Sequence, residues 1–219
     1  MKSLLILLLG VLFASHHMHA KQESSVSFRV TRFDPADRAA PEYQIADGTH
    51  IAVPMHNITK PLKATLRDGK FLDFFSPASD KKTPSISVSI PPDMRKNLLL
   101  IFVPSKDDYR VLKVHAPVDK LSGGSRLIVN ATRGDLAIKY GNSNPVILKS
   151  SRNATFRGNG DKAMVPVLIS QKTDTSWKLV RSERWPSDKR FRSFVFIYEK
   201  PDSHRIAVHA VPDRLPESE

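Results

Sequence analysis

One stretch of the chain occurs twice, and this repeat constrains the fold more than any other feature of the sequence. Residues 91–111 and 186–206 align without a gap at a spacing of 95 positions. The matching pairs are Pro91 with Pro186, Asp93 with Asp188, Arg95 with Arg190, Asp107 with Asp202, and Arg110 with Arg205. After a shift of one position the alignment continues and pairs His115 with His209. A repeat of this length predicts two similar halves that arose by internal duplication.

Short segments with the character of β-strands fill both halves. Residues 24–31 and 85–90 alternate between apolar and polar side chains, which is the pattern of a strand with one buried face. Asp68-Gly69 lies in the middle of residues 62–75 and predicts a β-hairpin with a two-residue type I′ turn. Apolar residues nowhere recur at helical spacing across three turns, so we expect almost no helix.

The apolar runs of the two repeat copies, residues 99–103 and 194–198, are too short for typical helices and predict the most buried strand of each half. About seven short strands per half predict an all-β fold of two tandem β-sandwich domains with immunoglobulin-like architecture. The Cys–Trp–Cys hallmark of antibody domains is absent, because the chain has no cysteine. We place the first sandwich at residues 21–118, the second at residues 122–213, and a frayed tail at residues 214–219.

The N-terminus has the features of a secretory signal peptide. Lys2 precedes an apolar run over residues 4–14, and the small residue Ala20 marks the expected cleavage point. The run is shorter than the roughly 20 residues that span a bilayer, and no later segment is long and apolar enough to do so. The absence of cysteine excludes disulfides and thiol chemistry. We therefore expect an exported protein in a bacterial periplasm or outside the cell, with residues 1–20 removed.

Sequence motifs for enzymatic chemistry are missing. The chain has no nucleophile elbow, no phosphate-binding loop, no zinc-protease motif and no glycine-rich dinucleotide fingerprint. Five histidines follow the signal peptide, and none has metal-site spacing with a nearby carboxylate: His50, His56, His115, His204 and His209. We expect no catalytic residue, no cofactor and no metal site, although paired acids in a cleft would support a hydrolase.

The chain is strongly basic, with a net charge of +12 that becomes +11 once Lys2 leaves with the signal peptide. Such a charge attracts polyanions. One candidate site for an anionic polymer or a sugar combines basic and aromatic side chains within 15 residues: Lys178, Arg181, Arg184, Trp185, Lys189, Arg190 and Arg192. We expect Trp185 to be exposed because it adjoins Pro186 at a turn, and Trp177 to be buried because it shares a strand face with Leu179.

These patterns predict an exported, non-enzymatic interaction or structural protein. The partner is an anionic polysaccharide or an anionic lipid surface, and we do not expect nucleic acid or a membrane span. One alternative is an accessory subunit that contacts an envelope protein through its sheet edges. A hydrolase is the other alternative. The repeated Asp and Arg residues are interpreted structurally, with Asp capping the turn and Arg pairing across the hairpin.

Overall fold

The fold is all-β, as predicted. The computed structural model describes residues 24–34, 39–77, 83–104, 109–117, 120–158, 164–200 and 203–215, so the predicted signal peptide lies outside the described residues. Within these residues the chain forms sixteen strands, and its helical structure includes the short 3-10 turn η1 (Pro92–Met94).

The first half contains one four-stranded sheet and two short hairpins. Its strands are β1 (Ser25–Arg32), β2 (Glu42–Gln44), β3 (His50–Ala52), β4 (Leu62–Thr65), β5 (Phe71–Phe74), β6 (Ile86–Ser89), β7 (Leu98–Pro104) and β8 (Tyr109–His115). The sheet order is β4-β1-β7-β8, with β1 parallel to β7 and antiparallel to β4. The hairpins β2-β3 and β5-β6 are linked by a bridge between Gln44 and Phe75.

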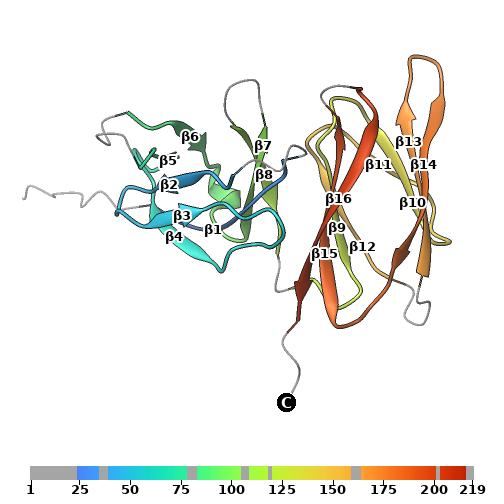
Figure 1. Cartoon of the computed structure of the whole chain (residues 1–219), viewed down its shortest axis with the longest axis horizontal. Coiled ribbons are helices and arrows are strands. Elements are labelled where there is room, and N and C mark those ends of the chain that lie inside the picture. The colour runs from blue at the N-terminus through green and yellow to red at the C-terminus, as the bar shows by residue number, and fades with distance from the viewer. Residues whose placement is uncertain are drawn as a thin grey trace, which may run out of the picture.

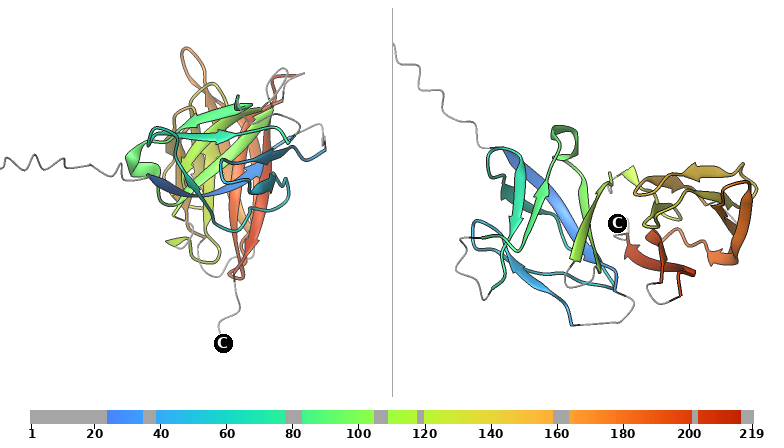
Figure 2. Two further views of the ribbon diagram at one scale, coloured as in Figure 1. Left: turned by 90° about the vertical axis from the view of Figure 1, so that its left-hand side faces the viewer. Right: turned by 90° about the horizontal axis from the view of Figure 1, so that it is seen from above.

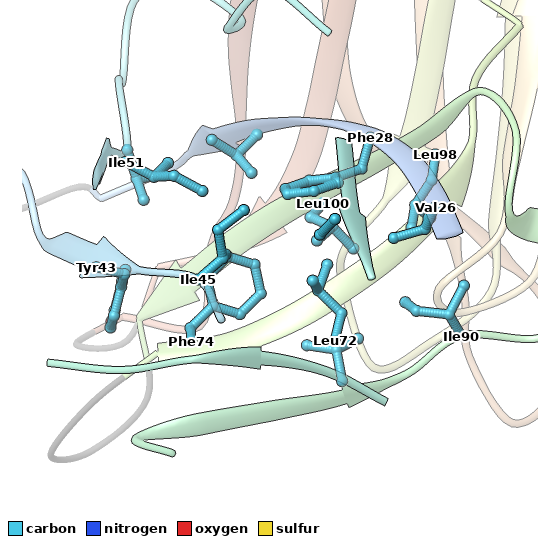
Figure 3. Packing of buried hydrophobic residues seen from close by; sticks show 14 of the residues in the cluster. Val26, Phe28, Tyr43, Ile45, Ile51, Leu72, Phe74, Ile90, Leu98 and Leu100 are labelled. Atoms are coloured by element: carbon cyan, nitrogen blue, oxygen red, sulfur yellow. The ribbon is translucent and has the colours of Figure 1, made fainter. Parts of the chain in front are cut away.

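The core of the first half lies between this sheet and the two hairpins. Phe28 and Leu100 of the sheet point toward Leu72 and Phe74 of β5 (Figure 3). The Phe74 ring lies edge-on to three neighbouring rings, with its centroid 6.2 Å from that of Phe28, 5.8 Å from that of Tyr43 and 5.3 Å from that of Phe102. Aromatic side chains therefore close this core where the covering hairpins are short.

The second half contains two four-stranded sheets. Its strands are β9 (Arg126–Asn130), β10 (Leu136–Tyr140), β11 (Val146–Leu148), β12 (Asn153–Phe156), β13 (Met164–Lys172), β14 (Trp177–Pro186), β15 (Phe191–Glu199) and β16 (Ile206–Arg214). One sheet has the order β12-β9-β15-β16, with β9 parallel to β15 and antiparallel to β12. This order and these strand directions match those of the first sheet. The other sheet, β11-β10-β13-β14, lies on the side of the second half that faces away from the first half (Figure 1) and is called the outer sheet below.

A separate apolar core joins the two halves, which lie side by side along the molecule (Figures 1 and 2). From β7 it receives Leu99, Ile101 and Val103, and from β15 it receives Phe194, Phe196 and Tyr198. Each of the three β7 residues lies 95 positions before one of the three β15 residues. The two central strands therefore contribute equivalent faces to one interface. The predicted buried strands are confirmed, and the halves share an apolar core instead of being connected only by the intervening chain.

The strand register corrects the alignment of the two histidines. His115 lies opposite Leu98 of β7, whereas His209 lies opposite Phe196 of β15. Leu98 corresponds to Ser193 in the repeat, so the proposed pairing of His115 with His209 was wrong. The connection between β15 and β16 is two residues longer than the one between β7 and β8, and this displaces the returning strand.

The predicted hairpin at Asp68-Gly69 is correct in its turn and wrong in its strands. Both residues have positive φ angles, 53° and 65°, as a type I′ turn requires. A single bridge joins Arg67 and Phe71, and then β4 pairs with β1 while β5 pairs with β6. The flanking strands separate because they belong to opposite layers of the same core.

Arg214, which was assigned to the C-terminal tail, belongs to a strand. Strand β16 continues through Arg214, and the backbone N–H of Leu215 donates to the carbonyl of Arg190 at 2.9 Å. Residues 216–219 of the predicted tail lie outside the described residues.

Candidate binding surface

The predicted basic patch does not form one free cationic surface. Its residues are distributed over β14, the connection to β15, and the start of β15. Three of the four arginines are ion-paired: Arg181 with Glu183 at 3.0 Å, Arg190 with Asp188 at 2.6 Å, and Arg192 with Asp213 at 2.8 Å. Arg184, Lys178 and Lys189 are exposed. The acids that neutralise the patch were visible in the sequence, but their pairing depends on strand geometry.

The expected burial of the two tryptophans is reversed. Trp185 is buried and packs near Tyr140, with the ring centroids 6.4 Å apart. Trp177 is exposed. The register explains both results, because Trp185 lies opposite the core residue Val165 while Trp177 lies opposite Lys172, at the end of the sheet. Sharing a face with Leu179 placed Trp177 on the solvent side.

A different surface has the exposed apolar side chains. Among the described residues, the large hydrophobic side chains that are most exposed all belong to the outer sheet: Val146 (39%), Ile147 (59%), Met164 (43%), Trp177 (41%) and Leu179 (54%). Scattered exposed apolar residues are ordinary on protein surfaces, whereas their concentration on one sheet indicates a contact surface.

Cross-strand register places two of these residues in one row across the sheet. Ala137 lies opposite Ile147 on one side and opposite Ser170 on the other, and Ser170 lies opposite Leu179. Directly opposed residues project to the same side. The neighbours of Ala137 on β10 are core residues, so this row lies on the solvent side, called the outer face below. Its centre has small side chains and its two ends have bulky apolar ones.

Basic residues share the outer face with this row. Lys139 lies opposite Leu168, Lys172 opposite Trp177, and Arg184 opposite Pro166. The four strands of the outer sheet contain one acidic residue, Glu183, which lies on the inner side opposite Val167. The outer face therefore combines apolar and cationic groups without an acid from its own strands.

The repeated Asp and Arg residues differ between the halves. In the second half Asp188 accepts hydrogen bonds from the backbone N–H of Arg190 at 2.9 Å and from its guanidinium, which agrees with the expected turn cap. The guanidinium bonds, and after them the backbone bond, lower the pKa of Asp188 to about 2. In the first half Arg95 donates instead to the carbonyl of Gly69 at 2.7 Å and to the hydroxyl of Ser24. Neither arginine pairs across its hairpin as expected.

His209 is the histidine most involved in packing, and its position was not foreseen. Its Nε2 lies 3.2 Å from the carbonyl oxygen of Met55, across the interface between the halves. Its ring stacks on Phe196 and approaches Phe33. Burial lowers the pKa of His209, and the nearby His56 lowers it further, against the raising effect of the bond to Met55. This histidine is therefore favoured in its neutral form.

Among the described residues, no group of three or more His, Cys, Asp or Glu side chains is positioned to hold a metal ion. No helix in the described part of the chain is long and apolar enough to cross a membrane.

Comparison with known proteins finds no protein-family model that matches the chain, and no curated protein whose sequence matches it.

Proposed function

We propose that the chain is an exported, non-enzymatic protein that binds an anionic lipid surface through the outer face. The supporting observation is that the exposed apolar side chains of the described residues are concentrated on the outer sheet, next to basic side chains. We further propose that its two immunoglobulin-like halves arose by duplication. The 95-residue repeat and the equal strand order of the β4-β1-β7-β8 and β12-β9-β15-β16 sheets support this origin.

A lipid surface suits this combination of side chains better than a polysaccharide does. Ile147 and Leu179 gain about 25 cal/mol for each Å² of apolar surface that leaves water, which a bilayer interface provides. Trp177 belongs to the residue type that is enriched at membrane interfaces. Each basic residue near an anionic leaflet adds about 1 kcal/mol, and the net charge of +11 of the exported chain favours the approach.

Vesicle binding of the chain from Lys21 onward tests the proposal. We expect co-sedimentation with vesicles of phosphatidylglycerol and phosphatidylcholine, weaker binding at high salt, and little binding to phosphatidylcholine alone. The double variant Ile147→Ser with Leu179→Ser should bind about tenfold more weakly or worse, because each exposed apolar side chain contributes to the buried area.

A charge-matched pair of variants separates the outer face from net charge. Lys139→Glu with Lys172→Glu should weaken vesicle binding much more than Lys60→Glu with Lys120→Glu, which changes the same charge at exposed positions elsewhere. Equal losses would assign the binding to net charge alone. Absence of binding to anionic vesicles at low salt would overturn the proposal.

The alternative function is an accessory subunit that accepts a strand from a protein partner. It is favoured by β14, a ten-residue strand at the edge of the outer sheet. A vesicle experiment without binding at low salt would leave this alternative as the better supported one.

A further inference from the structure

The second half has a hollow at the end of its sandwich, away from the outer face. It has a volume of ≈ 330 Å³ and lies where β9 and β15 begin, next to the C-terminal end of β14. The wall combines apolar side chains with polar ones: Ser125, Arg126, Pro186, Phe191, Ser193 and Pro212. The volume is near the lower end of the range for small-molecule sites, roughly 300 to 1,000 Å³.

Arg126 is the buried cation of this wall, with only 6% of the residue exposed. Its Nε donates to the hydroxyl of Tyr140 at 3.1 Å, and its Nη2 donates to the carbonyl of Pro186. The guanidinium also lies over the ring of Trp185, 5.6 Å from the centroid. Because Pro186 is part of the wall, these contacts hold the guanidinium at the hollow.

The charge of Arg126 has no acidic partner among the described residues. Its Nη1 makes no hydrogen bond there and is not sealed from solvent. Asp188, which also lines the hollow, is already bound by the guanidinium and the backbone N–H of Arg190. The free donors of the guanidinium are therefore available to a ligand.

The first half shows that the fold does not need this arginine. Strand register pairs Phe28 with Leu98 and Arg126 with Ser193, and Leu98 and Ser193 correspond in the repeat. Phe28 is fully buried in an apolar core. A hollow of ≈ 440 Å³ also lies at the start of β1 in the first half, where its wall includes Ser27 and Arg95 but not Phe28. Burying a guanidinium without a carboxylate is costly, and binding an anion offsets that cost.

We propose that the hollow of the second half binds a small organic anion, a carboxylate or phosphate group attached to an apolar ring or short chain. Arg126 binds the oxyanion, because a planar guanidinium matches two oxygens of such a group. Phe191, Pro186 and Pro212 contact the apolar part of the ligand. This site lies apart from the outer face and does not depend on lipid binding.

Tryptophan fluorescence tests the site, because Trp185 lies against the Arg126 guanidinium. A Trp177→Phe background leaves Trp185 as the single tryptophan. At constant ionic strength, benzoate and phenyl phosphate should change its emission saturably, whereas the neutral analogue benzyl alcohol should not. Arg126→Met should weaken benzoate binding about 10- to 100-fold, because a charge-assisted hydrogen bond is lost.

Arg184→Met is the matched control, since Arg184 is an exposed arginine of the outer face. It should leave benzoate affinity unchanged, and Ile147→Ser with Leu179→Ser should do the same, so failure of lipid binding and failure of this site are distinguishable. Circular dichroism shows whether Arg126→Met is folded. If Arg126→Met is not folded, NMR of the protein that retains Arg126 tests the site instead. Benzoate should then shift the Nε–H resonance of Arg126. Equal binding of benzyl alcohol, unchanged affinity in folded Arg126→Met, or an unmoved Nε–H resonance would overturn the proposal.

Discussion

The two halves of the chain present the same four-stranded sheet to their shared core and differ in what covers its other side. In the first half the cover consists of two short hairpins, β2-β3 and β5-β6, and aromatic rings close the core. In the second half the cover is the continuous outer sheet, whose β13 and β14 have nine and ten residues. Among the described residues, the most exposed large apolar side chains belong to the second half, and so does Arg126, which is buried without an acidic partner. The interface is thus common to both copies, whereas the proposed binding features are confined to one.

Phe28 and Arg126 occupy equivalent positions in the two halves. Placing each side chain in the other half should give the largest difference in the free energy of unfolding. Phe28→Arg places a guanidinium in an apolar core without a partner, and we expect a loss of about 4 kcal/mol or more in the free energy of unfolding. Arg126→Phe should change that free energy by only about 1 kcal/mol, because replacing a buried ion with a packed apolar group is often neutral. Urea unfolding monitored by circular dichroism measures both.

Two outcomes would break the comparison. Similar losses in both variants would mean that Arg126 is a structural residue of the second half. A tolerated Phe28→Arg would mean that the core of the first half accepts a guanidinium as readily as the second half does.

Cooperation between the halves is tested by a substitution in the first core. Phe74→Ala removes a fully buried ring that contacts Phe28 and Phe102, which should cost about 3 to 5 kcal/mol. Both tryptophans are in the second half, so their fluorescence reports unfolding there. Because the halves share a core, we expect the fluorescence midpoint in urea to fall together with the circular dichroism midpoint. Ile147→Ala, at an exposed position, is the control and should leave both midpoints unchanged. A fluorescence midpoint that does not move would show that the halves unfold independently.

The sequence predicted the features that depend on nearby residues. The alternation of residues 24–31 and 85–90 identified β1 and β6, and the apolar runs identified the buried strands β7 and β15. Asp68-Gly69 identified a turn with two positive φ angles. Each of these follows from side-chain periodicity or local backbone preference, which act within a few positions.

Features that depend on pairing between distant strands were not predictable. Trp185 is buried because β14 pairs with β13 in a register that includes a shift at Ile169/Ser170. The row from Ile147 to Leu179 joins four strands whose order the sequence does not reveal. Proline is usually confined to edge strands or bulges, yet Pro166 lies in β13, an inner strand, three residues before that shift. The candidate patch was assembled from sequence neighbours, and the strand geometry distributes its residues over β14, the connection to β15 and the start of β15.

Arg95 and Arg190, the repeated arginines, should give the smallest difference between the halves in the free energy of unfolding. Arg95→Ala removes the donor to the carbonyl of Gly69 and to Ser24, and should lower the free energy of unfolding by about 1 to 3 kcal/mol. Arg190→Ala, at the equivalent and exposed position, should leave the unfolding midpoint at neutral pH unchanged, because exposed ion pairs contribute little. A larger loss in Arg190→Ala than in Arg95→Ala would reverse this assignment.

The pKa of Asp188 measures what Arg190 does contribute. The side-chain hydrogen bonds from Arg190 are the main cause of a pKa of about 2, and the backbone N–H of the same residue is the next. A folded pKa below the ordinary value of 3.8 means that the carboxylate stabilises the fold above about pH 4, and that this contribution is lost as the pH falls toward 2. In Arg190→Ala the pKa, followed by NMR of the carboxyl carbon, should rise toward 3.8 without reaching it, because the backbone bond remains. A pKa that stays at about 2 would assign the shift to the turn itself, and the two copies of the repeat would then differ only in where their arginines point.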